Sequence, residues 1–470
     1  MEKNSTRYKG EEMLASINPA DQSTVGEVPL ATKNDVIQAV SKAKEHYLRW
    51  KEYSVTDRIP YVEKLAREME NRKEKMARLI SQEMGKPRQE AANEIQFALN
   101  FLRYYIQESP KILADEVLAQ SDKGLNRVVH EPVGVCGVIT PWNFPALMSI
   151  WGIMPNIIAG NTVVYKPSEN TPLIGQEIVN ALEFTGLPEG IVNIIHGDGR
   201  VGSLLVDSPV DLFWFTGSTR VGQEIFEKCG KKFIRCLLEL GGSSPAIVCE
   251  DADIDQAIGN IYFYRFFNCG QVCDAVKRLF VSESIFEEFV AKLCDKVRNA
   301  VVGNPSGEVN FGPLVSQKQL SLLEEQVQDA INKGARIEVG GGRPSDESLR
   351  EGFYYRPTVL TNVDFSMRVL NEEVFGPVLP VMAYGHIDEA INMANRTEYG
   401  LSAQIYTQNM DLGRRIAHRI DAGTVAINTN DYISPAFPFG GYKKSGMGRE
   451  GGKAGFHELT QIKHICERQG

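Results

Sequence analysis

Short apolar runs alternate with helix-like segments from residue 133 onward, and this alternation constrains the fold more than any other feature of the sequence. The apolar runs lie at 133–140, 162–165, 191–195 and 212–215, and the helical patterns lie at 171–184, 199–206 and 219–229. Strands and helices that alternate this closely are typical of βαβ units on a parallel sheet. A second alternation follows Gly241 and Gly242 and continues to about residue 428. The sequence therefore predicts an α/β protein with two such domains, which suits a chain of 470 residues.

Two regions stand apart from this alternation. Residues 34–49 and 56–108 are rich in Glu, Lys, Ala and Leu at helical spacing, and Asn34 and Thr56 are suitable N-caps. The segments 113–132 and 456–470 have strand character in a polar setting. Because an unpaired sheet edge is a liability, we expect these two segments to be edge strands that pair with another subunit.

Composition and charge argue against several classes of protein. A net charge of −9 disfavours nucleic acid as the main partner, since proteins that bind the phosphate backbone usually display excess basic charge. The longest apolar stretch, 145–160, is interrupted by Gly152 and Pro155 and falls short of the roughly 18 residues that cross a bilayer. We therefore expect it in the core.

The first residues and the cysteine content indicate the cellular compartment in which the protein is found. The N-terminus is polar and lacks the apolar core of a secretory signal. Eight cysteines are far too few for a disulfide framework in a chain of this length. These features predict a cytoplasmic protein with reduced thiols and no membrane contact.

A strand–turn–helix pattern at 211–229 carries Gly217 directly after the strand and Gly222 in the first turns of the helix. Glycine lets a backbone approach a ligand closely, and a helix N-terminus offers free N–H groups and a positive dipole to a pyrophosphate. The pattern differs from the usual G-x-G-x-x-G of dinucleotide sites. Taken alone, it fits an ordinary βα turn equally well.

Lys166 and Glu169 follow another predicted strand, at the edge where open α/β sheets bind their ligands. A carboxylate there can accept hydrogen bonds from the ribose hydroxyls of an adenosine, and it would repel the extra phosphate of NADP. A solvated charge pair in a loop is the alternative interpretation.

Asn143 lies in the segment Thr140-Pro141-Trp142-Asn143-Phe144-Pro145. Each proline restricts itself and the residue before it, so the asparagine is held stiffly. A rigid side-chain amide can donate to a developing oxyanion. The alternative is a turn amide that bonds its own backbone.

Glu239 and Cys273 are the candidate reactive groups. Glu239 ends an apolar run, and a carboxylate among apolar neighbours should have a raised pKa, which suits a general base near neutral pH. Cys273 follows a Gly-Gln turn, and its thiol would need backbone amides or a cationic nicotinamide to favour the thiolate. No histidine is close to it in the sequence, so a Cys–His pair is not supported.

The remaining cysteines carry no such pattern. We expect them to be inert core residues: Cys136, Cys229, Cys236, Cys249, Cys294 and Cys466. Cys269 and Cys273 form C-x-x-x-C, but no second cysteine pair or histidine cluster completes a tetrahedral set. We therefore expect no metal site.

Seven motifs, in order, resemble the aldehyde dehydrogenase family over nearly the whole chain. They are ITPWNFP (139–145), AGNTVVYKPSE (159–169), FTGSTRVG (215–222), LELGG (238–242), GQVC (270–273), EEVFGPV (372–378) and PFGGYKKSGMGRE (438–450). The resemblance implies an α/β fold with two Rossmann-like parallel-sheet domains, one for the cofactor and one catalytic, plus a small β oligomerisation element.

The same resemblance implies domain bounds and an oligomeric state. Residues 1–112 and 133–241 would form the dinucleotide-binding domain, and 242–446 the catalytic domain. Residues 113–132 and 447–470 would form the oligomerisation element and C-terminal tail. The family implies a homodimer or homotetramer.

By this resemblance, Cys273 is the nucleophile, Glu239 the general base, and Asn143 forms an oxyanion hole with the Cys273 backbone N–H. The thiolate would attack an aldehyde, a hydride would pass to the nicotinamide, and the thioester would be hydrolysed by water that Glu239 deprotonates. The resemblance places in the cofactor groove Thr140, Trp142, Lys166, Glu169, Gly217, Ser218, Gly222, Leu240, Glu373 and Phe375. Apolar residues beside the motifs predict a substrate pocket of Phe144, Leu147, Met148, Trp151 and Phe267.

Three positions depart from the family's usual pattern. Gly152 stands where a lysine often supports a proton relay from the general base, and we consider Lys453 as a replacement ammonium. Cys269 stands where Ala or Ser is commoner, and we expect a small buried thiol there rather than a disulfide partner for Cys273. Asp274 follows the nucleophile where an uncharged residue is commoner, and its carboxylate should raise the thiol pKa unless it points away.

Alternatives remain for cofactor, chemistry and substrate. Glu169 favours NAD over NADP. Glu239 favours hydrolysis over transfer to CoA, and intact Cys273, Glu239 and Asn143 favour an enzyme over a non-catalytic NAD-binding protein. The C-terminal motif is similar to the succinate-semialdehyde branch, which would need a cationic anchor for a distal carboxylate. Arg265 and Lys277 are the candidate anchors.

Overall fold

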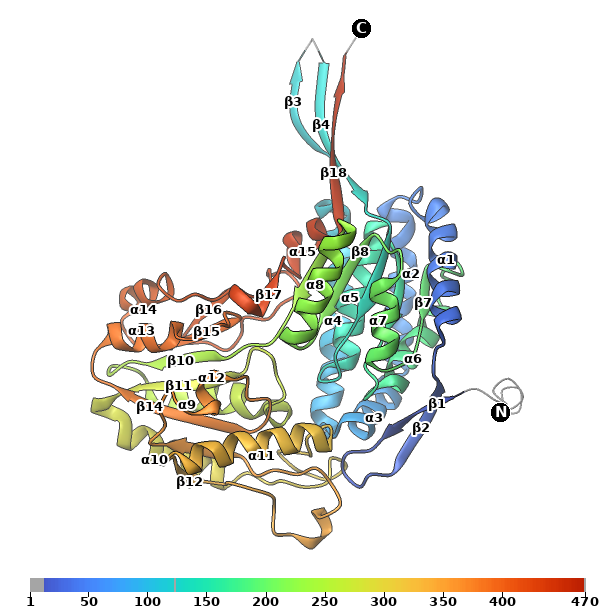
Figure 1. The fold of residues 1–470 in the computed structure, drawn as a ribbon. Helices are drawn as coiled ribbons and strands as arrows, with labels where there is room; N and C mark the ends of the chain where they lie inside the picture. The colour runs from blue at the N-terminus through green and yellow to red at the C-terminus, as the bar shows by residue number, and fades with distance from the viewer. Residues whose placement is uncertain (1–11, 122–123, 469–470) are drawn as a thin grey trace.

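The computed structural model describes residues 12–121 and 124–468, and its centre is formed by two large, mainly parallel sheets (Figure 1). The six-stranded sheet has the order β17-β9-β8-β5-β6-β7. Its strands are β5 (Val135–Ile139), β6 (Thr162–Lys166), β7 (Val192–Ile194), β8 (Leu212–Thr216), β9 (Arg235–Glu239) and the antiparallel β17 (Gly446–Met447). The predicted parallel-sheet architecture is confirmed.

The seven-stranded sheet has the order β12-β13-β14-β11-β10-β15-β16, in which only β12 is antiparallel to its neighbour among the described strands. Its strands are β10 (Ser244–Val248), β11 (Val276–Ser282), β12 (Arg336–Val339), β13 (Thr358–Thr361), β14 (Val378–Tyr384), β15 (Ser402–Tyr406) and β16 (Thr424–Ile427). Helices connect successive strands, as parallel pairing requires.

Helices cover both sheets. Around the six-stranded sheet are α1 (Lys33–Trp50), α2 (Val55–Asn71), α3 (Lys73–Met84), α4 (Arg88–Ile112), α5 (Pro145–Ala159), α6 (Pro172–Glu183), α7 (Gly199–Asp207), α8 (Thr219–Lys232) and α15 (Gly452–Glu458). With the seven-stranded sheet lie α9 (Ile254–Phe266), α10 (Phe286–Arg298), α11 (Gln317–Asn332), α12 (Arg368–Asn371), α13 (Ile387–Asn395) and α14 (Met410–Ala417). Every residue of α5 is buried, so the apolar stretch is a core helix, and no helix in the described part of the chain has the length and apolarity to cross a membrane.

The first two helices begin earlier than the predicted N-caps. Thr32 caps α1 and Ser54 caps α2, so the expected caps Asn34 and Thr56 lie inside the helices. In each helix the capping hydroxyl accepts from the N3 backbone N–H, while the N3 aspartate (Asp35 or Asp57) accepts from the backbone N–H of the cap. This reciprocal capping box satisfies two donors at once, which a single side chain at the predicted position cannot do.

The predicted helical region 56–108 is three helices. Gly85, with a left-handed φ of 79°, ends α3, and Pro87 precedes α4. A short hairpin, β1 (Met13–Ile17) and β2 (Thr24–Pro29), precedes α1.

A three-stranded antiparallel sheet extends away from the body of the molecule (Figure 1). Its order is β18-β4-β3, with β3 at Glu116–Ser121, β4 at Gly124–Pro132 and β18 at Thr460–Glu467. Both segments predicted to be edge strands are therefore strands, and they pair with each other within the chain. Val117, Leu118 and Ile462 of the outer strands are exposed. Pairing with another subunit stays a prediction.

Candidate active site

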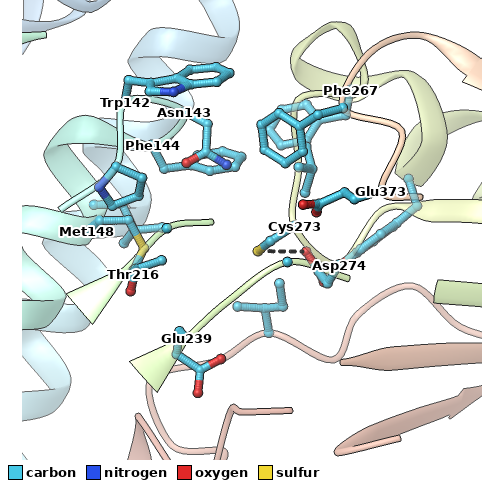
Figure 2. Close-up of a pocket in the computed structure, with 18 of the residues that line it drawn as sticks. Trp142, Asn143, Phe144, Met148, Thr216, Glu239, Phe267, Cys273, Asp274 and Glu373 are labelled. Carbon is cyan, nitrogen blue, oxygen red and sulfur yellow. Dashed lines mark hydrogen bonds between the residues drawn. The ribbon is translucent and has the colours of Figure 1, made fainter. Parts of the chain in front are cut away.

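A cavity of about 860 Å³ lies where the carboxyl ends of β5, β8 and β9 face the segment that precedes β11. Parallel strands end at the same sheet edge, which brings together side chains that are far apart in the sequence. The following predicted site residues line the cavity: Trp142, Asn143, Phe144, Leu147, Met148, Trp151, Gly217, Ser218, Glu239, Leu240, Phe267, Cys273, Glu373 and Phe375. Figure 2 shows the Cys273 sulfur between Asn143 and Glu239.

Cys273 follows a strained turn. Asn268, Cys269 and Gly270 have left-handed φ values of 52°, 55° and 70°, a conformation that costs a non-glycine residue about 1–2 kcal/mol. The backbone N–H of Asn268 donates to the carboxylate of Glu90 on α4 (3.0 Å), 178 residues away in sequence. Glu90 was not predicted from the sequence, since nothing local to it indicates this contact. It joins the N-terminal helices to the loop that carries Cys273.

The surroundings of Cys273 disfavour its thiolate. Burial raises its pKa well above the ordinary value, Asp274 raises it further, and the Lys277 ammonium lowers it. Asp274 points toward the sulfur, because the thiol donates to its Oδ1 (3.9 Å between Sγ and Oδ1). The expected increase in thiol pKa from this carboxylate is therefore present.

Both the side chain and the backbone carbonyl of Asn143 are hydrogen-bonded. Its side-chain amide donates to the Gln271 carbonyl (3.0 Å), which leaves one amide hydrogen free for another acceptor. Its backbone carbonyl accepts from the Asn268 side chain (3.0 Å) and from Lys86 (2.9 Å). Lys86 in turn forms a buried ion pair with Glu94. Asn143 does not bond its own backbone in the manner of a turn amide.

Glu239 lines the cavity and has a second buried carboxyl group, Glu450, as its neighbour. Glu239 is 2% exposed, as is Glu450 in the segment before α15, and the Glu239 oxygens have no hydrogen-bond partner within 12–121 and 124–468. Burial raises the pKa of Glu239 well above the ordinary value, and the neighbouring Glu450 raises it further. Glu450 lies within the quoted motif 438–450, but no side-chain role for it could be read from that motif.

On the cofactor side, Ser218 precedes α8, and no side chain in the described residues caps this helix or puts an acidic group in its first turn. Gly222 packs against Leu240: a Cβ at Gly222 would lie 2.3 Å from a Leu240 methyl. Glu373 accepts from the Gly242 N–H (3.0 Å) and from Lys277 (2.7 Å). A helix N-terminus that lacks a side-chain cap and an acidic first-turn residue, and that lies behind a glycine turn, fits a pyrophosphate.

Four predicted cofactor residues do not line the cavity itself. Thr140 is buried, and its hydroxyl is directed to the Tyr165 hydroxyl (3.4 Å). Gly222 packs against Leu240 instead of lining the cavity. Lys166 is buried at the end of β6, with Nζ 3.7 Å from a Glu169 oxygen. The Glu169 side chain is 46% exposed, so its carboxylate is free to meet a ligand at the rim of this sheet edge.

Two sequence predictions about cationic groups are wrong. Arg265 is buried and donates to the carbonyls of Val276, Val374 and Gly376, and Lys277 is held by Glu373 and two carbonyls. Neither residue lines the cavity, because both side chains donate to buried carbonyl groups beside the seven-stranded sheet. Lys453 is exposed and close to His130 and His457, so it is no replacement ammonium for the Glu239 region.

The cysteines mostly follow the prediction. Cys136, Cys229, Cys249 and Cys294 are buried, and Cys236, expected in the core, is half-buried. Cys466, also expected in the core, is exposed on β18 because its strand extends away from the body. Cys269 is a buried thiol whose charged neighbours are Glu90 and Arg265. Within the described residues, no group of three or more His, Cys, Asp or Glu side chains is placed to hold a metal ion.

Comparison with known proteins gives one family. The model of the aldehyde dehydrogenase family matches residues 6–465. The chain belongs to this family. The betaine aldehyde dehydrogenase of Bacillus subtilis is 37% identical over 97% of this chain and 94% of the relative. A probable succinate-semialdehyde dehydrogenase [NADP(+)] of Sinorhizobium fredii is 36% identical over 96% of this chain and 91% of the relative.

A solved aldehyde dehydrogenase has the same fold. The betaine aldehyde dehydrogenase of Staphylococcus aureus, crystallised in complex with NAD+, superposes with a TM-score of 0.93 at 34% identity, covering 97% of this chain and 91% of that one. Family and relatives together identify the chain as an enzyme of the aldehyde dehydrogenase type.

One departure from the family pattern has a structural basis. A Cβ at Gly152 of α5 would lie 2.9 Å from the Trp214 ring and 2.9 Å from Val138. The indole of Trp214, which is 1% exposed, therefore fills the space beside α5 at the position where related aldehyde dehydrogenases often carry a lysine.

Proposed function

We propose that this aldehyde dehydrogenase oxidises an aldehyde to a carboxylic acid by covalent catalysis on Cys273, with NAD as the hydride acceptor. The observation that carries the proposal is that Cys273, Asn143 and Glu239 line one cavity although they come from different parts of the chain. A nucleophile, an oxyanion donor and a base around one reacting carbon are what acyl chemistry requires.

In the proposed reaction, Cys273 attacks the aldehyde carbonyl and forms a thiohemiacetal. The oxyanion accepts from the free amide hydrogen of Asn143 and from the Cys273 backbone N–H. Because Gln271 and Lys86 already hold Asn143, this donor does not need to reorganise as charge develops. The bound dinucleotide supplies the hydride acceptor, and Cys273 then carries a thioester.

Glu239 would deprotonate the water that hydrolyses the thioester. Its raised pKa suits a general base that works near or above neutral pH, and its carboxyl oxygens are unpartnered among the described residues and so free to bind a water. Retention of this base supports hydrolysis over transfer to CoA. It also argues against a non-catalytic NAD-binding protein.

For the cofactor, the uncapped N-terminus of α8 would hold the pyrophosphate, and Trp142, Glu373 and Phe375 would lie along the nicotinamide end. Glu169 at the end of β6 supports NAD, because a carboxylate repels a 2′-phosphate. The Staphylococcus aureus neighbour holds NAD+, whereas the Sinorhizobium fredii relative is named for NADP.

For the substrate, we propose a neutral or cationic aldehyde rather than a semialdehyde with a distal carboxylate. No Lys, Arg or His is among the residues that line the cavity in the described parts of the chain. Its lining includes carboxyl groups such as Asp431 and Glu90, and aromatic rings: Phe97, Phe144, Trp151, Phe263, Phe267 and Phe439. Aromatic faces and carboxylates attract cations, and an anion would enter without a partner.

We further propose the division into a dinucleotide-binding unit (1–112 and 133–241), a catalytic unit (242–446) and an arm (113–132 with the tail). The exposed apolar residues Val117, Leu118 and Ile462 of the arm support contact with a second copy in a homodimer or homotetramer.

Two measurements test the function. Cys273→Ala should abolish NADH formation with every aldehyde while NAD affinity, followed by nicotinamide fluorescence, stays within twofold of the wild type. A panel of butanal, betaine aldehyde and succinate semialdehyde should show kcat/KM at least tenfold lower for the last, about 1.4 kcal/mol. NADH production by the alanine variant would refute the covalent route, and a preference for succinate semialdehyde would refute the substrate class.

A further inference from the structure

The carboxyl group of Asp274 lies against the sulfur of Cys273. The thiol donates to Oδ1 across 3.9 Å, the contact dashed in Figure 2. Asp274 is 2% exposed, and its carboxylate contacts the Cys273 thiol on one side and the Tyr432 hydroxyl on the other. Asp and Glu side chains are rarely fully buried, so a buried carboxylate in contact with the candidate nucleophile indicates a functional role.

Other ionisable groups surround this pair from every side. Lys277 of β11 contacts the Cys273 carbonyl and is paired with Glu373, and Glu239 faces the sulfur from β9. Tyr264 of α9 and Tyr432 of the segment after β16 face Asp274. No histidine is among the residues that line the cavity in the described chain. Of these groups, Asp274 is the base that accepts from the thiol.

We propose that Asp274 is a further catalytic residue, which takes the proton of the Cys273 thiol during attack on the aldehyde and returns it when the thioester is cleaved. The proposal rests on the covalent function proposed above. It assigns the activation of the nucleophile to Asp274 and leaves the activation of water to Glu239.

The steps balance as follows. The S–H bond breaks, its proton passes to Oδ1 of Asp274, the S–C bond forms, and the carbonyl electron pair becomes the oxyanion held by Asn143. The oxyanion then expels a hydride to the dinucleotide, which is reduced, and the carbon becomes a thioester. Water loses a proton to Glu239 as it attacks, and Glu239 releases that proton to solvent before the next turnover. The C–S bond breaks, and the leaving thiolate takes its proton back from Asp274.

The two roles of Asp274 at rest and in reaction are compatible. At rest the thiol donates to the carboxylate, and the charge of that carboxylate raises the thiol pKa. Burial raises the pKa of Asp274 as well, which makes its carboxylate a stronger base than a solvated aspartate. As the sulfur bonds to carbon, the thiol becomes more acidic and its proton passes to Oδ1.

Asp274→Asn distinguishes a catalytic base from a carboxylate that only raises the thiol pKa, because the two roles predict opposite changes in the rate of acylation. A carboxylate that only raises the thiol pKa slows attack, so its removal would accelerate acylation. A proton acceptor assists attack, so its removal should slow the pre-steady-state burst of NADH at least tenfold, given that general bases contribute about 10²–10⁴-fold. Alkylation of Cys273 by iodoacetamide at pH 7 should instead become faster, since the thiol pKa falls.

The matched control is Asp255→Asn on α9, an exposed aspartate paired with Lys292 (3.2 Å), which should leave both rates unchanged. A slow burst together with faster alkylation supports the proposal. An unchanged or faster burst overturns it, and so does alkylation that slows along with the burst, because that result indicates a displaced sulfur. If the burst persists in Asp274→Asn and is absent in Cys273→Ala, the inference fails while the proposed function stands.

Discussion

Removing the charge of Glu94 should destabilise the protein more than any comparable change at a surface ion pair. Lys86 and Glu94 have side-chain exposures of 0% and 1%, and Lys86 also donates to the backbone carbonyl of Asn143. Glu94 further accepts from the backbone N–H groups of Ala146 (2.9 Å) and Leu147 (3.2 Å) at the start of α5. Glu94→Gln keeps the shape and removes the carboxylate that is paired directly with the buried ammonium, which leaves only the charge of Glu90 nearby.

The size of the effect follows from this burial. Removing one partner of a buried pair costs about 3–5 kcal/mol, roughly a thousandfold in the folding equilibrium. The control is Glu74→Gln, whose pair with Arg88 (3.3 Å) is 75% and 47% exposed and should contribute less than about 1 kcal/mol. Urea unfolding followed by tryptophan fluorescence measures both variants. The NADH burst of Glu94→Gln should also fall, because Asn143 loses part of its support.

The contrary result is equally clear. If the free energies of unfolding of Glu94→Gln and Glu74→Gln differ by less than about 1 kcal/mol, the buried pair contributes no more to stability than a surface pair. The link from Lys86 to the position of Asn143 would then also be refuted.

Three further predictions concern the reaction. Glu239→Gln should retain the NADH burst and lower steady-state turnover by about 10²–10⁴-fold, measured by stopped-flow absorbance; loss of the burst would place Glu239 before hydride transfer. Glu239 acts as a base only when ionised and its pKa is raised, so turnover limited by hydrolysis should rise with pH. Glu450→Gln removes the neighbouring charge and should move this rise to lower pH. A pH–rate profile that does not shift would show that the two carboxyl groups are not coupled. Glu169→Ser should improve kcat/KM with NADP relative to NAD, and an unchanged ratio would refute electrostatic exclusion of the 2′-phosphate.

The sequence predicts those parts of the fold that depend on local patterns. The apolar runs at 133–140, 162–165, 191–195 and 212–215 correspond to β5, β6, β7 and β8. The motifs single out Asn143, Glu239 and Cys273, which line one cavity in the structure. The helix starts were less accurate, although the Thr32/Asp35 and Ser54/Asp57 spacings could have indicated the true caps.

Contacts between distant residues could not be predicted in this way. Glu90 holds Asn268 across 178 positions, and no pattern near either residue indicates the contact. The wrong assignment of Arg265 and Lys277 has the same origin. Both lie close to Cys273 in sequence, but their side chains turn toward buried carbonyls, which only the packed structure makes visible.

The contact between Gly152 and Trp214 also determines which of these two positions can be substituted first. With the indole in place, any side chain at 152 meets atoms 2.9 Å from its first carbon, and a small residue at 214 alone would leave a void in the interior. A scan of single substitutions would therefore score both sites as intolerant. A side chain with an amine at 152 requires that the Trp214 ring and the Val138 methyl, each 2.9 Å from the added carbon, have first been shortened or displaced, so a single substitution at 152 cannot introduce it without strain.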